Sequence, residues 1–221
     1  MSYSHFPKQQ GLYYPQLEKD SCGVGFVCQV KGQRSNKIIK QSLQVLKRLA
    51  HRGAVGSDPK TGDGAGILIQ IPDEFFQKIS PQSKINLPPQ GSYGTGLIFL
   101  PTDRLERKIC QELFSQVVKT EGQILLGWRD VPVDNSDIGL TAKKTQPVIS
   151  QVFIGKNPKI TDQLAFERKL YVIRRVIENA VSTLKLKQES FFYITSLSSR
   201  TFAYKGLLMT DQLENFFPDL K

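Results

Sequence analysis

The order of strand-like and helix-like patterns along these 221 residues limits the possible folds more than any other feature. Strands alternate apolar and polar residues, whereas amphipathic helices repeat apolar residues every three or four positions. These patterns predict strands at 23–30, 67–72, 93–101, 148–154, 191–197 and 200–208, and helices at about 36–50, 103–120 and 163–184. Because helices and strands do not alternate strictly, the order favours a layered α+β fold with mainly antiparallel sheets over a parallel Rossmann sheet.

The first strand and the first helix show their spacing clearly. The strand is predicted from the alternating residues Val24, Phe26, Cys28 and Val30, which would give it one strongly buried face. The helix is predicted from one apolar stripe made of Ile39, Leu43, Leu46 and Ala50. Ser35 or Asn36 can cap this helix, and Gly53 ends it.

Four finer expectations concern the other strands. Residues 67–72 read as a buried strand, and 148–154 as a strand with mixed faces. Residues 127–132 read as a turn into a loop after a short strand. Residues 198–199 would join the last two strands.

Composition narrows the class of protein. Hydrophobic residues make up 39% and charged residues 23%, which is ordinary for a globular chain. No apolar stretch approaches the ~18 residues that a membrane-spanning helix needs, so we expect no membrane segment. The net charge of +10 comes from scattered lysines and arginines. This distribution favours a solvated surface over a nucleic-acid site.

The cysteines and histidines restrict the chemistry. Cys22, Cys28 and Cys110 form no Cys-x-x-Cys pair, which argues against a disulfide scaffold and a zinc site and for a reducing compartment. The histidines, His5 and His51, leave few candidates for a general base. We interpret His51 as a structural residue at a helix end rather than as a base.

Residues 1–21 have the character of a leader that precedes the functional domain at 22–221. The leader is polar and lacks the apolar core of a signal peptide. Its removal would make Cys22 the first residue, with a nucleophilic thiol and a free α-amine of pKa about 7.7–8.0 that can act as a base. The alternative is that Cys22 is a small buried hydrophobe. Gly23 and Gly25 favour the functional reading, because they leave bare backbone where a substrate can approach.

The glycine-rich stretch 53–66 must be a shaped loop, and it matches neither a dinucleotide fingerprint nor a P-loop. One reading makes it a tight helix-to-strand connection with Arg52 and Asp63 solvated or paired. The other places Arg52 near the nucleophile, where its guanidinium could bind a substrate carboxylate. Trp128 suits a core anchor better than a ligand loop.

Six segments together resemble the amino-terminal glutaminase domain of the glutamate synthase large subunit. They are 20–26 (DSCGVGF), 49–54 (LAHRGA), 61–72 (TGDGAGILIQIP), 126–134 (LGWRDVPVD), 166–171 (FERKLY) and 196–201 (SLSSRT). The similarity extends from about Gly11 to Leu220. Each segment alone is weak, but the combination is specific.

The resemblance implies a type 2 glutamine amidotransferase, an N-terminal-nucleophile hydrolase built as an αββα four-layer sandwich. It implies that Cys22, freed from a propeptide, attacks glutamine to give a thioester, ammonia and then glutamate. Arg52 matches the family's arginine beside the nucleophile. In the family the ammonia reacts with 2-oxoglutarate at a flavin site that ferredoxin or an NAD(P)H-linked partner supplies with electrons. FMN and the iron–sulfur cluster belong to later regions, so we expect no cofactor and no metal in this chain. A cytoplasmic or plastid location would suit such a protein.

The sequence departs from the family at its end. In similar proteins the domain continues past Lys221 with an asparagine–glycine oxyanion hole and most glutamine-binding residues. We therefore expect a sandwich incomplete at its C-terminal side and little or no glutaminase activity from this chain alone. The alternatives are another type 2 amidotransferase, and a non-catalytic remnant that needs a partner chain.

Overall fold

The larger of two antiparallel sheets has four strands in the order β3–β4–β2–β5. A computed structural model describes residues 8–14 and 22–221 of the chain. The strands are β2 (Tyr93–Leu100), β3 (Ile124–Asp130), β4 (Val148–Gly155) and β5 (Tyr193–Ile194). β4 pairs with β2 over its whole length, from Tyr93 opposite Gly155 to Leu100 opposite Val148. The predicted α+β class with antiparallel sheets is confirmed.

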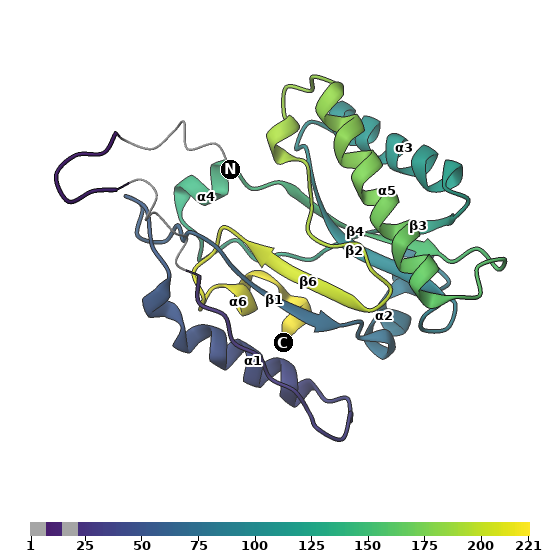
Figure 1. The fold of residues 1–221 in the computed structure, drawn as a ribbon, viewed down its shortest axis with the longest axis horizontal. Helices are drawn as coiled ribbons and strands as arrows, with labels where there is room; N and C mark the ends of the chain where they lie inside the picture. Colours follow the sequence, from purple (N-terminus) through teal and green to yellow (C-terminus); the bar gives the residue numbers. More distant parts are fainter. Residues whose placement is uncertain (1–7, 15–21) are drawn as a thin grey trace.

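Two long helices, α3 (Arg104–Thr120) and α5 (Gln163–Thr183), cover one face of this sheet (Figure 1). Each begins at an aspartate, Asp103 or Asp162, whose carboxylate accepts two backbone N–H bonds of the first turn. Their apolar stripes and the β2 and β4 residues of this face form one buried cluster. These helices match the predicted ones at 103–120 and 163–184 closely, because a long stripe of period 3.6 is a local signal.

The second sheet has two antiparallel strands, β1 (Ala65–Gln70) and β6 (Thr201–Gly206). One of its faces carries Ile67, Phe202 and Tyr204, which share a buried cluster with the inner face of the larger sheet. Helix α1 (Asn36–Arg48) contributes Leu43 to this cluster. From upper right to lower left, Figure 1 therefore shows helices, sheet, sheet and helix, as the αββα arrangement requires.

Short helices complete the fold. They are α2 (Asp73–Ile79), α4 (Leu140–Lys144) and α6 (Leu213–Phe216), with 3₁₀ turns η3 (Ala50–Arg52), η4 (Ser80–Ser83), η5 (Glu189–Phe191) and η6 (Pro218–Leu220). Phe76 of α2 fills the space between the sheets, with its ring 5.7 Å from that of Phe153 and 5.1 Å from that of Phe202. Among the described residues, no helix is both long and apolar enough to cross a membrane.

The predicted strand at 23–30 is wrong. Residues 22–29 have no regular structure, and the apolar side chains of Val24, Phe26 and Val30 are exposed rather than buried. A strand needs hydrogen bonds from a neighbour, and no described residue pairs with this segment. It lies instead along α1, where Gly25 approaches Val45 so closely that an added Cβ would be 2.5 Å from its Cγ1.

Other strand details also differ from expectation. Residues 127–132 are not a turn, because β3 runs on to Asp130 after a bulge between Leu125 and Gly127, and the φ of Gly127 is 153°. β4 has no mixed faces but is buried on both, since it lies centrally between two covered faces. β1 is buried at Ile67 alone, and Leu68 on its other face is 67% exposed.

The last two strands do not pair as neighbours. β5 joins β2 in the large sheet, while β6 joins β1 in the small one. Ser198 bridges Thr95, and both Ser198 and Ser199 hydrogen-bond to Glu167 of α5. These bonds redirect the chain from one sheet to the other.

Candidate functional site

Cys22 is exposed and opens the irregular segment that lies along α1. The reading of Cys22 as a buried small hydrophobe is therefore wrong. Gly23 lies against Arg52, since a Cβ added at Gly23 would be 3.1 Å from the Arg52 Cβ and Cγ atoms. The fold thus brings together the backbone beside the predicted nucleophile and the predicted substrate-binding arginine, which are about 30 residues apart in sequence.

Arg52 is held by the 3₁₀ turn η3 that follows α1. Its backbone N–H donates to the Leu49 carbonyl at 2.8 Å, and the N–H of Gly53 donates to the Ala50 carbonyl at 3.1 Å. His51 Nδ1 lies 3.2 Å from the Arg48 carbonyl oxygen. His51 therefore has the helix-end contact that its structural reading predicts, while the Arg52 side chain stays exposed.

The glycine-rich stretch after Arg52 is a small hairpin, which the sequence patterns did not reveal. Val55 and Gly62 form an antiparallel bridge. The N–H of Gly56 donates to the Thr61 carbonyl at 3.2 Å, and that of Asp63 donates to the Ala54 carbonyl at 3.1 Å. We call residues 54–63 the site hairpin. Its base is the hydrogen-bonded pair Ala54 and Asp63, and Arg52 lies two residues before Ala54 in the chain.

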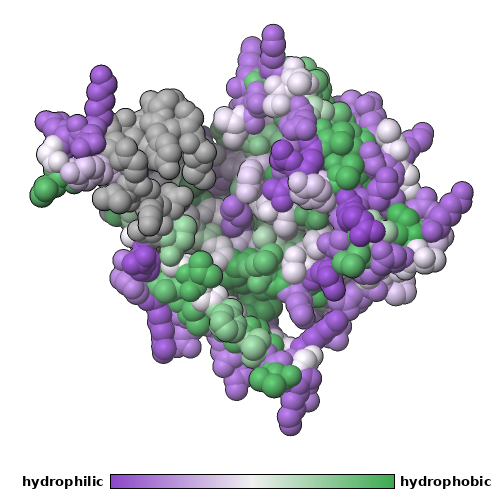
Figure 2. All heavy atoms as spheres, in the orientation of Figure 1, coloured by the Kyte–Doolittle hydropathy of each residue, from purple (hydrophilic) through white to green (hydrophobic). Residues whose placement is uncertain are grey.

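An open hollow of about 530 Å³ begins at the base of the site hairpin. Asp63 and Gly64 form one end, and Lys205 and Tyr193 contribute on the side of the sheets. The Lys205 ammonium lies 4.8 Å from the centre of the Tyr193 ring. Figure 2 shows apolar surface gathering over the lower part of the molecule, where Figure 1 places α1 and, above it, β1.

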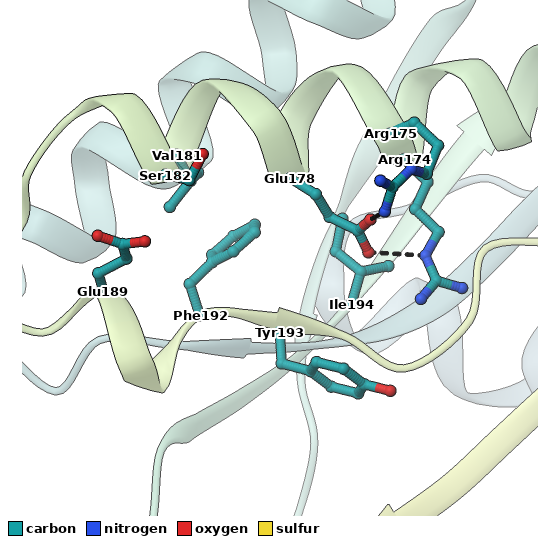
Figure 3. Close-up of a pocket in the computed structure, with 9 residues that line it drawn as sticks. All are labelled: Arg174, Arg175, Glu178, Val181, Ser182, Glu189, Phe192, Tyr193 and Ile194. Atoms are coloured by element: carbon teal, nitrogen blue, oxygen red, sulfur yellow. Dashed lines mark hydrogen bonds and ion pairs between the residues drawn. The ribbon is translucent and has the colours of Figure 1, made fainter. Parts of the chain in front are cut away.

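A second hollow, of about 320 Å³, lies between α5 and the segment around β5 (Figure 3). There Glu178 accepts from Arg174 Nε at 2.8 Å and from Arg175 at 2.5 Å. The ring of Phe192 stands between this cluster and Glu189. Neither Cys22 nor Arg52 lines either hollow; the first reaches the base of the site hairpin at Asp63, and the second has no residue of the predicted site.

The remaining candidates have structural contacts. Trp128 packs edge-on against Phe114 with ring centres 5.1 Å apart, as its core-anchor reading predicts. Cys110 is buried, and this burial raises the pKa of its thiol to about 11. Cys28 is exposed. In the described part of the chain, no group of three or more His, Cys, Asp or Glu side chains is arranged to hold a metal ion.

Sequence reasoning missed one buried charged contact. Arg129 binds both carboxylate oxygens of Asp219, at 2.8 and 2.9 Å, although the two residues are 90 positions apart. Gln151 and Tyr204 add hydrogen bonds to the same pair. No local pattern could have linked these residues, because the pairing exists only after the C-terminal segment reaches the inner face of the large sheet.

Comparison with known proteins gives one family and several relatives. Residues 22–221 match the family "Glutamine amidotransferases class-II", so the match begins at Cys22. The chain is 48% identical, over all of its length, to the glutamate synthase (NADPH) large chain of Bacillus subtilis, 14% of which it covers. It is 41% identical over 97% of its length to the glutamate synthase (NADH) of Schizosaccharomyces pombe, of which it covers 10%. It is 38% identical over 97% of its length to the chloroplastic ferredoxin-dependent glutamate synthase 2 of Arabidopsis thaliana, of which it covers 13%. The chain thus spans about one seventh or less of each relative.

Proposed function

Because the chain belongs to the class-II glutamine amidotransferases, we propose that it forms the nucleophile-bearing part of a glutaminase. Cys22 is the nucleophile, and Arg52 binds the substrate or sets the charge around it. The observation that carries this proposal is an exposed cysteine at the first residue of the family match, with Arg52 packed against the next residue.

Removal of residues 1–21 prepares the nucleophile in this proposal. Residues 15–21 lie outside the described part of the structure, so the proposal rests on the sequence and on the start of the family match. Cleavage before Cys22 frees an α-amine whose pKa of about 7.7–8.0 lets it accept the thiol proton near neutral pH. The remaining residues, 22–221, form the first part of the amidotransferase domain.

The reaction then runs in two steps. The Cys22 thiolate attacks the side-chain amide carbon of glutamine, the C–N bond breaks, and the nitrogen leaves as ammonia after taking a proton. Water next attacks the thioester carbon, which releases glutamate and restores the thiol. Both steps pass through an oxyanion that backbone N–H groups can stabilise. The planar Arg52 guanidinium suits a carboxylate, which favours the α-carboxylate of glutamine as its ligand.

The wider role follows from the relatives, whose names specify NADPH-, NADH- or ferredoxin-dependent glutamate synthase. We propose that the ammonia released here serves glutamate synthesis from 2-oxoglutarate in a larger synthase. The rest of that protein would carry FMN and an iron–sulfur cluster and receive the electrons. The cysteines, two of them exposed, suit a reducing compartment such as the cytoplasm or a plastid stroma.

The test is the intact mass of the purified chain before and after treatment with the glutamine analogue 6-diazo-5-oxo-norleucine. We expect loss of residues 1–21 and one adduct on Cys22, because a single covalent adduct needs a reactive thiol but not the repeated turnover of glutamine that this chain is expected to lack. The variant Cys22→Ser should take no adduct, and the control Cys28→Ser should still take one. A full-length mass without an adduct, or an adduct that follows Cys28, would refute the proposal for this chain.

A second candidate function, a non-catalytic piece that acts with a partner chain, is favoured by the exposed apolar residues. Val24, Phe26 and Val30 are each at least 87% exposed, and a group of exposed apolar side chains often marks a protein–protein contact. Light scattering separates the two candidates. A monomer that takes the Cys22 adduct supports the glutaminase, whereas an assembly that takes none supports the partner-dependent piece.

A further inference from the structure

The tip of the site hairpin is tied to two distant segments through one carbonyl group. The Lys60 carbonyl oxygen accepts from the Gly139 N–H at 2.9 Å and from Gln212 Nε2 at 3.0 Å. Gln212 Nε2 also donates to the Asp137 carbonyl at 2.9 Å. Gln212 as a whole is 3% exposed, so these bonds are shielded from water. One buried amide therefore connects the hairpin, the loop before α4 and the turn before α6.

A carboxylate closes the tip from the other side. Asp58 accepts from the Lys60 N–H at 3.1 Å, from the Thr61 hydroxyl at 3.0 Å and from the Thr141 N–H at 3.1 Å. The bond from Thr141 is the main cause of a lowered pKa of Asp58, with the Lys60 N–H next. Asp58 thus stays an ionised acceptor over the whole neutral range.

Glycines keep these segments in close contact. A Cβ added at Gly62 would lie 2.5 Å from the carbonyl group of Leu208, and one at Gly139 would collide with the side chains of Asp58 and Thr61. Gly62 is buried. The hairpin tip therefore has little freedom to shift without losing its hydrogen bonds.

The base of the same hairpin leads directly to the predicted site. A Cβ added at Gly53 would lie 3.4 Å from Asp63 Oδ1, and the Asp63 N–H donates to the Ala54 carbonyl at 3.1 Å. Arg52 precedes Gly53 and packs against Gly23. A movement of the tip is thus carried through a short paired ribbon to the arginine beside the nucleophile.

We propose that Gln212 and Asp58 are positioning residues that fix Arg52 relative to Cys22 by clamping the tip of the site hairpin. The proposal rests on the proposed function, because it assigns these residues to the geometry of the glutaminase site. A guanidinium that binds a carboxylate through two bonds requires placement within about 0.5 Å. Because the Arg52 side chain is itself exposed, hydrogen bonds that join three segments at the hairpin tip would be what holds Arg52 in place.

The experiment compares Gln212→Met with the wild-type chain and with a matched control, Gln188→Met. Gln188 is also an amide that makes several hydrogen bonds, to Thr102 and Asp103 at the start of α3, and it takes no part in the clamp. Two rate constants of Cys22 modification are measured by intact mass, with every variant made in a Cys28→Ser background because Cys28 is also exposed. One reagent is 6-diazo-5-oxo-norleucine, which must fit a glutamine site, and the other is iodoacetamide, which needs only an accessible thiolate. Hydrogen exchange of the Gly56 and Asp63 amides is measured in parallel.

We expect Gln212→Met to slow modification by the glutamine analogue about tenfold to a hundredfold, and to change the iodoacetamide rate less than about twofold. The two hairpin amides should exchange at least about tenfold faster. Gln188→Met should change none of these quantities. Asp58→Asn leaves one of the three N–H or O–H donors without its acceptor. It should also slow modification by the glutamine analogue and speed exchange of the two hairpin amides, but by smaller factors than Gln212→Met.

Three results would overturn the inference. They are an unchanged analogue rate in Gln212→Met, an equal slowing of both reagents, and the same response in Gln188→Met. If the wild-type chain itself does not react with the analogue, the proposed function fails, and hydrogen exchange still decides whether Gln212 holds the hairpin. Should Gln212→Met not fold, Asp58→Asn carries the same comparison.

Discussion

The buried ion pair between Arg129 and Asp219 allows the sharpest prediction about stability. Their side chains are 9% and 6% exposed, and two parallel bonds of 2.8 and 2.9 Å join them. Among the described residues, replacement Asp219→Ala leaves the buried Arg129 guanidinium with the Gln151 amide oxygen, at 3.1 Å, as its one side-chain partner. Removing one member of a buried pair typically costs about 3–5 kcal/mol, because the remaining charge stays desolvated.

For a chain of this length, each kcal/mol corresponds to a change of about 2–4 °C in melting temperature. We therefore expect Asp219→Ala to lower the melting temperature by roughly 6–20 °C. The double variant Arg129→Met with Asp219→Leu should regain most of this loss, because no charge is then buried. Calorimetry and urea unfolding measure both changes.

A surface pair provides the control. Lys108 and Glu112 lie 3.6 Å apart with side chains 71% and 59% exposed, so Glu112→Ala should cost no more than about 0.5 kcal/mol. If Asp219→Ala costs less than about 1 kcal/mol, or if the double variant is no more stable than the single one, the argument from desolvation is wrong.

Three further predictions follow from other contacts. Gly96→Ala should abolish folding of the isolated chain in a circular dichroism melt, because the added Cβ would collide with the Ser196 carbonyl. Cys110 should stay unmodified by iodoacetamide at pH 8 until urea unfolds the chain. Burial raises the pKa of its thiol from 9.0 to about 11, so the unfolded state loses this proton at a lower pH than the folded state. The free energy of unfolding should therefore decline as the pH rises from 9 to 11. Ser35→Ala should cost about 0.5–1 kcal/mol in urea unfolding, since the Ser35 hydroxyl accepts from the first turn of α1, whereas Ser35→Asp should preserve it.

The elements that could be predicted from the sequence are those whose signal is local. The stripe of α5 and the aspartate cap at Asp162 together specify a helix without reference to the rest of the chain. β2, at Tyr93–Leu100, is bounded by a proline and a loop and has the length of a strand. Cys22 and Arg52 could be singled out because their neighbours are glycines and because the segments around them resemble a known family.

What could not be predicted depends on contacts between distant segments. The site hairpin lacks the alternating apolar pattern of a strand pair, and its tip is held by Asp58 and by Gln212, some 150 residues later. β3 continues through Gly127 because β4 is its neighbour, although a glycine followed by polar residues suggests a turn. In both cases the partner supplies the hydrogen bonds, so the local sequence carries only part of the information.

The segment 22–30 shows that a local pattern can also predict a strand that does not form. Its alternation of Val24, Phe26 and Val30 is a strand pattern, yet in the described structure these side chains face water. β1 and β6 pair only with each other among the described residues, so each has an unpaired edge. An exposed alternating segment and sheets with open edges are features that folded proteins normally avoid or cover. The alternating pattern therefore does not suffice to form a strand, because no strand among the described residues supplies its hydrogen bonds, and Cys22 at its start is exposed.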